Sequence, residues 1–171
     1  NTQEQIYNTI DTLLSQAIKD LGATSNLIAL SGDLIYTNSR PSWIKAAYAI
    51  RARYALYKKN YANALTYISN SFTATDKFIV TFGTSNAEAN PMYQFATVSS
   101  YAPDIKMCKT FIDKLNATTD PRRTFYAKLL GSLYVGSAAG SENANASGLG
   151  TYNNSASAPV VLSSYADMQF I

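Results

Sequence analysis

The acidic side chains with a spacing that could suggest catalysis are Asp104, Asp113 and Asp120. A glycosidase needs two carboxylates on either side of the bond that it cleaves. The apolar spacing of this stretch predicts one helix near 104–116, on which Asp104 and Asp113 share a face but lie about 13 Å apart along the axis. That distance exceeds what either glycosidase mechanism uses. Asp120 precedes Pro121 and is better explained as a turn or cap residue, so the sequence argues against an enzyme.

Histidine is absent, and cysteine occurs once, at Cys108. Within this chain, that composition excludes Cys/His zinc sites, Ser-His-Asp triads and Cys-His dyads. We therefore predict neither a metal nor a cofactor. Cys108 falls inside the predicted helix near 104–116, where a buried, inert thiol is the default expectation.

Tyrosine is unusually frequent, with 13 copies beside seven Phe and one Trp. Its apolar ring and polar hydroxyl suit both helix packing and surfaces that contact carbohydrate or protein. The net charge of +3 is too small to indicate a nucleic-acid partner. No run of residues predicts a membrane-spanning helix or a signal peptide. Both ends fall within helical patterns, so we expect residues 1–171 to be a single fragment of a larger domain.

The basic residues concentrate in residues 40–59, which carry six Lys and Arg and no acidic residue. Such side chains usually cover apolar surface and pair with acids on neighbouring helices; a basic binding face is the alternative. Arg51 and Arg53 lie roughly 200° apart around a helix and cannot serve one flat surface together. We expect at least one of them to be buried and bonded to a carboxylate or carbonyl.

The elements that would position these groups are mainly helical. An amphipathic helix is predicted near 3–21, with Thr2 as its cap and Gly22 after its end. Apolar residues then recur at steps of three and four in two runs, 43–58 and 61–71, which predicts an antiparallel hairpin over 43–72. Its alternation of large and small residues resembles a tetratricopeptide unit, although an ordinary helix pair would look similar.

The rest of the chain is less regular. Residues 22–42 form a connector that ends at Arg40-Pro41-Ser42, with Ser42 as a possible cap. Strands should be short and confined to 72–103 or 124–162. A turn is expected at Asn90-Pro91. Residues 131–158 form a long polar loop rich in Gly, Ala, Ser and Asn, and such loops are usually functional or mobile. From Pro159, the apolar run at 160–162 leads into the start of a further helix at residues 165–171.

Several landmarks in this order resemble the SusD/RagB family of outer-membrane nutrient-binding lipoproteins, in particular its SusD-like branch. The stretches that carry the resemblance are GDLIY at 32–36, WIKA at 43–46, NPMYQF at 90–95, FIDKL at 111–115 with DPR at 120–122, and residues 159–171. No single stretch is specific, but the ordered set covers nearly the whole chain. The resemblance implies a central fragment of an α-α superhelix with a tetratricopeptide-like core, long irregular loops and at most short strands.

What the resemblance implies about function is capture rather than catalysis. Such proteins are lipid-anchored on the outer surface of the outer membrane. There they bind a nutrient, usually a glycan, and deliver it to a TonB-dependent, SusC-like transporter. The lipid anchor would lie outside these residues, so the only contact with a membrane would be through that anchor.

The candidate ligand-binding residues lie in irregular segments, where binding residues concentrate. Aromatic faces stack on the C–H surface of sugars, and amides bond to the hydroxyls. The candidates are Tyr134, Tyr152, Asn153, Asn154 and Tyr101. Each aromatic could instead anchor its loop on the helical core, and Tyr93 and Phe95 fit that structural role better.

Two other functional classes stay open at this stage. A tetratricopeptide-type adaptor would bind a peptide in a helical groove, but it would need further repeats and would have no use for the NPMYQF turn. A glycoside hydrolase would need a carboxylate pair at a suitable separation.

Overall fold

The structure is a computed structural model that describes residues 2–24, 32–98, 104–141, 143–150 and 155–171. It is mainly helical, and the chain forms two compact units. The first, here the helical unit, joins residues 1–80 to residues 161–171, and the second, here the inserted unit, comprises residues 81–160. The inserted unit thus interrupts the sequence of the helical unit.

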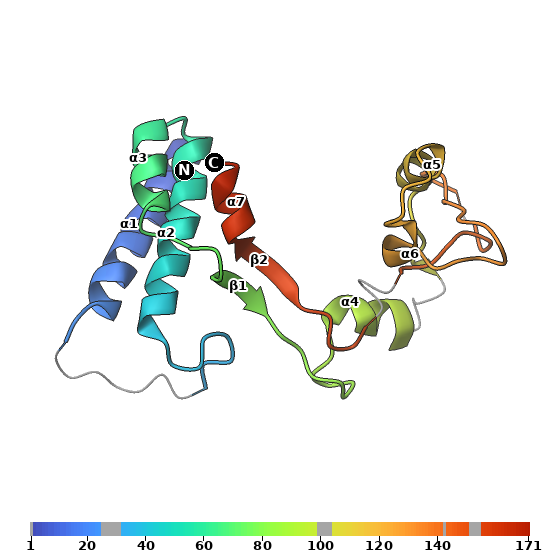
Figure 1. The fold of residues 1–171 in the computed structure, drawn as a ribbon, viewed down its shortest axis with the longest axis horizontal. Coiled ribbons are helices and arrows are strands. Elements are labelled where there is room, and N and C mark those ends of the chain that lie inside the picture. Colours follow the sequence, from blue (N-terminus) through green and yellow to red (C-terminus); the bar gives the residue numbers. More distant parts are fainter. Residues whose placement is uncertain (1, 25–31, 99–103, 142, 151–154) are drawn as a thin grey trace. The chain divides into compact units, whose positions relative to one another are not determined.

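The helical unit contains the predicted hairpin. Helix α1 (Gln3–Leu21) packs on α2 (Arg40–Tyr57), and α2 packs on α3 (Tyr61–Ile68), as Figure 1 shows. The three residues between α2 and α3 reverse the chain, and the rings of Tyr48 and Tyr67 then lie 6.3 Å apart between centroids. The antiparallel pair is therefore confirmed, although α3 ends earlier than the predicted residue 71.

The ends of these helices follow from local chemistry. Thr2 forms a capping box with Gln5 at the start of α1, as the sequence predicted for Thr2. The prediction of Ser42 as the cap of α2 is wrong, because Ser39 occupies that position and its hydroxyl accepts from the Ser42 backbone at 3.4 Å. Pro41 is compatible with this earlier start, because proline is well tolerated in the first turn of a helix.

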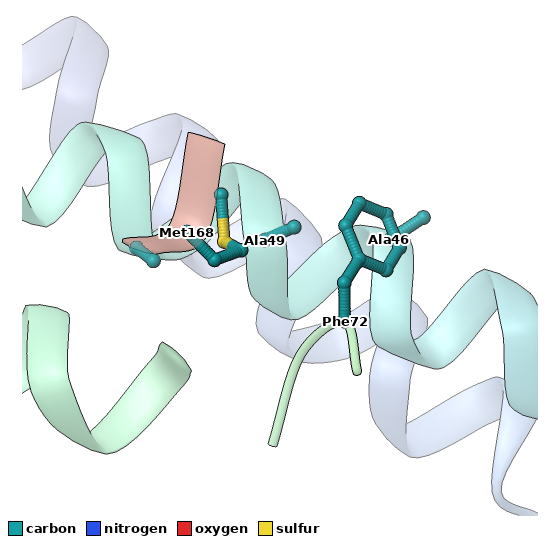
Figure 2. Close-up of a cluster of buried hydrophobic side chains, with 5 residues drawn as sticks. Ala46, Ala49, Phe72 and Met168 are labelled. Atoms are coloured by element: carbon teal, nitrogen blue, oxygen red, sulfur yellow. The ribbon is translucent and has the colours of Figure 1, made fainter. Parts of the chain in front are cut away.

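The centre of the helical unit is a stripe of alanines. Ala46, Ala49 and Ala52 of α2 are at most 1% exposed and pack with Phe72 and Met168 (Figure 2). Small side chains let neighbouring segments approach the axis of α2 closely, and close packing here leaves no room for larger ones. Helix α1, by contrast, has no fully buried residue, and its Leu13 is 64% exposed.

A two-stranded sheet closes this unit. Strand β1 (Lys77–Val80) pairs with β2 (Val160–Ser164), and β2 runs directly into α7 (Tyr165–Gln169). Both strands are short, as expected, and β2 extends two residues beyond the predicted limit of 162. Helix α7 carries Met168 into the alanine stripe (Figures 1 and 2).

The segment before α2 is organised by Asp33. Its carboxylate accepts backbone hydrogen bonds from Ile35, Tyr36 and Asn38 and a bond of 2.9 Å from the indole nitrogen of Trp43. Desolvation raises the pKa of Asp33, but these four hydrogen bonds outweigh it and hold the pKa at about 2. The GDLIY stretch therefore has a structural role, which is to fix the entry to α2.

The inserted unit is less regular. Helix α4 (Pro91–Tyr93) continues into a π-helical turn, η1 (Gln94–Val98), and two further helices follow, α5 (Lys109–Ala117) and α6 (Arg123–Tyr126). The predicted helix near 104–116 thus begins five residues late. Residues before Lys109 pair with the later loop instead, since Met107 donates to the Ser147 carbonyl at 2.8 Å and accepts from Ser137 at 2.8 Å.

The late start of α5 also changes the setting of Cys108. This residue is the N-cap of α5 and is exposed, so the prediction of a buried thiol is wrong. Asp104 lies outside α5, and Asp113 pairs with Lys109 within it. The two carboxylates therefore do not share a helix.

Candidate ligand-binding pocket

A pocket of about 330 Å³ lies within the inserted unit. It is lined from four places in the sequence, namely residues 96–97, residues 105–106, residues 128–130, and the part of the polar loop that includes 144 and 146–149. Pockets of this size are typical of small-molecule sites. The loop that the sequence singled out therefore contributes one wall of a cavity, together with three segments that the sequence did not connect to it.

Backbone hydrogen bonds hold the loop in place at the pocket. Ser147 is 1% exposed; its backbone nitrogen donates to the Val135 carbonyl at 2.7 Å, and its hydroxyl accepts from the Val135 nitrogen at 3.1 Å. Lys128 donates its backbone N–H to the Gly148 carbonyl at 2.9 Å. Because these bonds cross from one loop segment to another, the wall of the pocket is built into the fold of this unit.

Two glycines outside the pocket lining allow this close backbone approach. A Cβ at Gly150 would lie 2.5 Å from the Ala127 nitrogen and 2.5 Å from the Phe125 carbonyl oxygen. A Cβ at Gly136 would lie 2.7 Å from the Lys109 nitrogen. At Gly148, which lines the pocket, an added Cβ would meet no atom within 4 Å. The pocket therefore has room for a side chain at Gly148, whereas the other two positions have none.

The charge of the pocket comes from Lys106 and Lys128. These are the charged residues among those that line it, and no acidic residue of the described part of the chain does so. Within the same described residues, neither ammonium group has a carboxylate partner. The lining also includes the aliphatic side chains Ile105, Leu129 and Leu130. The sequence indicated neither lysine as a site residue, because Lys106 falls within the predicted helix near 104–116 and Lys128 in a segment with no predicted site.

Tyr134 is the predicted site residue that the structure describes, and it does not line this pocket. Its half-buried ring lies 5.4 Å from the guanidinium carbon of Arg123, and its carbonyl accepts from Asn116 at 3.0 Å. These contacts tie Tyr134 to α5 and α6, as a loop anchor would be tied. The other predicted site residues, Tyr101, Tyr152, Asn153 and Asn154, lie outside the described residues.

The NPMYQF turn is structural where the structure describes it. Asn90 is 2% exposed and caps α4, and its amide donates to the Ala158 carbonyl at 2.7 Å. Its backbone nitrogen also donates to Ala156 at 2.7 Å. After this turn, Tyr93 is half-buried and Phe95 is 53% exposed, so their role as loop anchors stays a prediction.

Across the described ranges, no group of three or more Cys, Asp or Glu side chains is arranged to hold a metal ion. None of the helices formed by those residues is both long and apolar enough to cross a bilayer.

The described residues thus form a mainly helical fold with an alanine-centred helix hairpin, a small two-stranded sheet and a pocket built from loops. The chain belongs to the SusD-like_2 family, described as starch-binding and associating with the outer membrane, whose model matches residues 1–171. None of the curated proteins matches the chain.

Solved structures share this fold at low sequence identity. A SusD/RagB family protein from Bacteroides thetaiotaomicron is 24% identical, with a TM-score of 0.78, over 99% of this chain and 40% of that one. A SusD homologue from Bacteroides ovatus is 20% identical, with a TM-score of 0.74, over 99% and 39% of the two chains. A structure described as a chitin-binding protein is 23% identical, with a TM-score of 0.71, over 99% and 42%. This chain thus spans about two fifths of the length of these proteins.

Proposed function

We propose that this chain is part of a surface glycan-binding protein that delivers its ligand to a TonB-dependent, SusC-like transporter of the outer membrane. The observation that carries the proposal is the family match over all 171 residues, because that family is described as starch-binding and outer-membrane associated. The neighbour described as a chitin-binding protein supports a carbohydrate ligand. In this proposal the protein binds the glycan without cleaving it and is held at the outer surface by a lipid anchor.

The inserted unit is the part that we assign to the ligand. It contains the pocket of about 330 Å³ and the polar loop at 131–158. We keep the predicted residues Tyr134, Tyr152, Asn153, Asn154 and Tyr101 as candidate contacts. The Tyr134 ring has one face toward Arg123, so a sugar would have to stack on its other face or displace the arginine.

The test is a binding measurement on the protein with whatever sequence flanks these residues in its gene. An array of neutral and charged glycans identifies the bound class, and calorimetric titration gives the affinity. Tyr152→Ala should weaken binding by about tenfold or less, since one aromatic contact contributes on the order of 1 kcal/mol. Its melting temperature should stay within a few degrees of the wild type. A large loss of stability with unchanged affinity would instead make Tyr152 a loop anchor.

Delivery and location need separate experiments. The transporter should co-purify with the tagged protein from mild detergent extracts of outer membranes, and protease added to intact cells should degrade the protein. Recovery of the protein in the soluble fraction, or protection from protease, would contradict the surface assignment. Chromatography of each bound glycan after long incubation should show no cleavage products.

A further inference from the structure

We propose that the pocket of the inserted unit binds the anionic group of an acidic glycan, with Lys106 and Lys128 as its two cationic contacts. This inference rests on the proposed function and narrows the class of ligand. Both charged residues that line the pocket are basic, which favours an anionic ligand. An uncharged sugar would not require that arrangement.

Neither pocket lysine has a counterion within the described part of the chain. The described basic residues Lys45, Arg51 and Arg122 each pair with an aspartate, and Lys109 pairs with Asp113 on its own helix. Lys106 and Lys128 have no carboxylate partner among the described residues; this is also true of Lys59, Lys77 and Lys114, but Lys106 and Lys128 both line the same pocket. Two like charges beside one cavity repel each other, and an anion bound between them removes that repulsion while adding charge-assisted hydrogen bonds.

Backbone hydrogen bonds fix the chain at or next to both lysines. Lys128 is held by its backbone bond to Gly148, and Lys106 precedes Met107, whose backbone is bonded to Ser137 and Ser147. Both Cα positions are thus fixed by the same hydrogen-bonded loop wall. This arrangement reduces the entropy that an anion has to remove to engage the two side chains.

The other side chains that line the pocket also bear on the class of ligand. Ile105, Leu129, Leu130 and Leu149 offer apolar surface for the C–H face of a sugar ring, whereas none of the described residues that line the pocket is aromatic. With no ring available for stacking there, polar recognition must carry more of the affinity. The ligand class that combines an apolar ring face with a negative charge is a sugar that bears a carboxylate or a sulfate.

The test compares acidic and neutral oligosaccharides of similar length on the protein with its flanking sequence. The probes are oligogalacturonides for the carboxylate, chondroitin sulfate oligosaccharides for the sulfate, chito-oligosaccharides and malto-oligosaccharides as neutral sugars, and inorganic sulfate as a free anion. At least one acidic oligosaccharide should have an affinity about ten or more times that of the neutral ones. Its affinity should fall as ionic strength rises from about 0.05 to 0.5 M. Tight binding of inorganic sulfate alone would contradict recognition of a sugar.

The variants are Lys106→Gln and Lys128→Gln, with Lys114→Gln as the matched control. Lys114 lies on α5 in the same unit, has an exposed side chain and does not line the pocket. Each pocket variant should weaken acidic-glycan binding by about tenfold and leave the neutral glycans unchanged, whereas the control should behave as the wild type. A further variant, Gly148→Phe, adds bulk where a Cβ meets no neighbour, and it should block every ligand of the pocket without lowering the melting temperature.

The outcomes separate this inference from the proposed function. If no oligosaccharide of either kind binds, the glycan-binding function fails, and the inference fails with it. If neutral glycans bind as tightly as acidic ones, or if acidic glycans bind equally well to both lysine variants, only the inference is overturned.

Discussion

Arg51 of α2 and Asp11 of α1 join the first two helices through a paired contact, in which Arg51 Nε donates to Asp11 Oδ1 at 2.8 Å. Its Nη2 donates to Asp11 Oδ2 at 3.3 Å and to the Tyr67 hydroxyl at 2.7 Å. The guanidinium carbon also lies 4.1 Å from the centroid of the Tyr67 ring. The Arg51 side chain is 12% exposed, so one basic residue connects α1, α2 and α3. The expectation that Arg51 or Arg53 would be buried and paired is confirmed.

Replacing Arg51 should therefore destabilise the helical unit. Arg51→Met keeps the apolar stem but removes every donor, and it leaves Asp11 without its partner. We expect a loss of about 1–3 kcal/mol, the range for a hydrogen bond to a charged group, measured by urea denaturation with far-UV circular dichroism. Lys19→Met, at an exposed end of α1, serves as the control and should change stability little. An equal loss in both variants would contradict the role of Arg51.

Acid should destabilise the same unit through Asp33. Its pKa of about 2 lies below the value near 3.9 expected in the unfolded chain, so its contribution to stability is complete above about pH 4 and is lost as the pH falls toward 2. Asp76 acts in the same direction, because hydrogen bonds from Lys45 and Thr73 hold its pKa at about 2.

The measurement is thermal stability at several pH values between about 2 and 5. Asp33→Asn should melt at a lower temperature than the wild type at pH 5, and the difference should shrink toward pH 2. Asp20→Asn is the matched control, since Asp20 accepts a hydrogen bond from Gln16 on the exposed surface of α1. A constant difference between Asp33→Asn and the wild type across this range would contradict the assignment.

The alanine stripe predicts a strong preference for small side chains. Ala52 is 0% exposed, so Ala52→Leu should overpack the contact and cost about 1–3 kcal/mol. Met168→Ala should remove the side chain that covers the stripe and cost about 2–5 kcal/mol. Ala62→Leu on the exposed surface of α3 should be close to neutral. Urea denaturation of the three variants gives the comparison, and a neutral Ala52→Leu would show that the stripe is loosely packed.

Three glycines in the inserted unit should respond differently to the same substitution. Gly136→Ala and Gly150→Ala each place a Cβ against backbone atoms and should cost about 1–3 kcal/mol or more. Gly148→Ala meets open space and should be tolerated. Hydrogen exchange of the backbone amides of Ser147 and Lys128 reports on this unit directly. If all three variants exchange like the wild type, the close approach at Gly136 and Gly150 is absent in solution.

The parts of this structure that could be predicted from sequence are those fixed by neighbours in the chain. Thr2 and Gln5 form a capping box within one turn, and the spacing of apolar residues after Ser42 specifies a helix hairpin. Which side chains are buried in the core was harder to predict from the sequence. Periodicity alone places Trp43 and Ala47 on the same face of the helix and does not say which of them is buried. In the structure the neighbouring segments approach the axis of α2 closely, so the alanines are buried while Trp43 is half-buried.

The parts that could not be predicted depend on long-range pairing. Residues 104–108 have the apolar spacing of a helix, but Met107 bonds to Ser137 and Ser147 instead, and Cys108 consequently becomes an exposed cap. The pocket arises from four separated segments, so neither Lys106 nor Lys128 stood out in the sequence. The sequence suggested aromatic residues as sugar contacts, whereas the described lining of the pocket contains lysines and aliphatic side chains.

The place of Met168 in the alanine stripe has a consequence for biosynthesis. The alanines of α2 leave the ribosome more than a hundred positions before Met168, one of the two larger buried residues that pack on them. At ordinary elongation rates of about 5–20 residues per second, that delay is on the order of ten seconds. During this time the whole inserted unit is synthesised, and the stripe can pack with Phe72 but not yet with Met168. The core of the helical unit is therefore completed only after α7 has emerged.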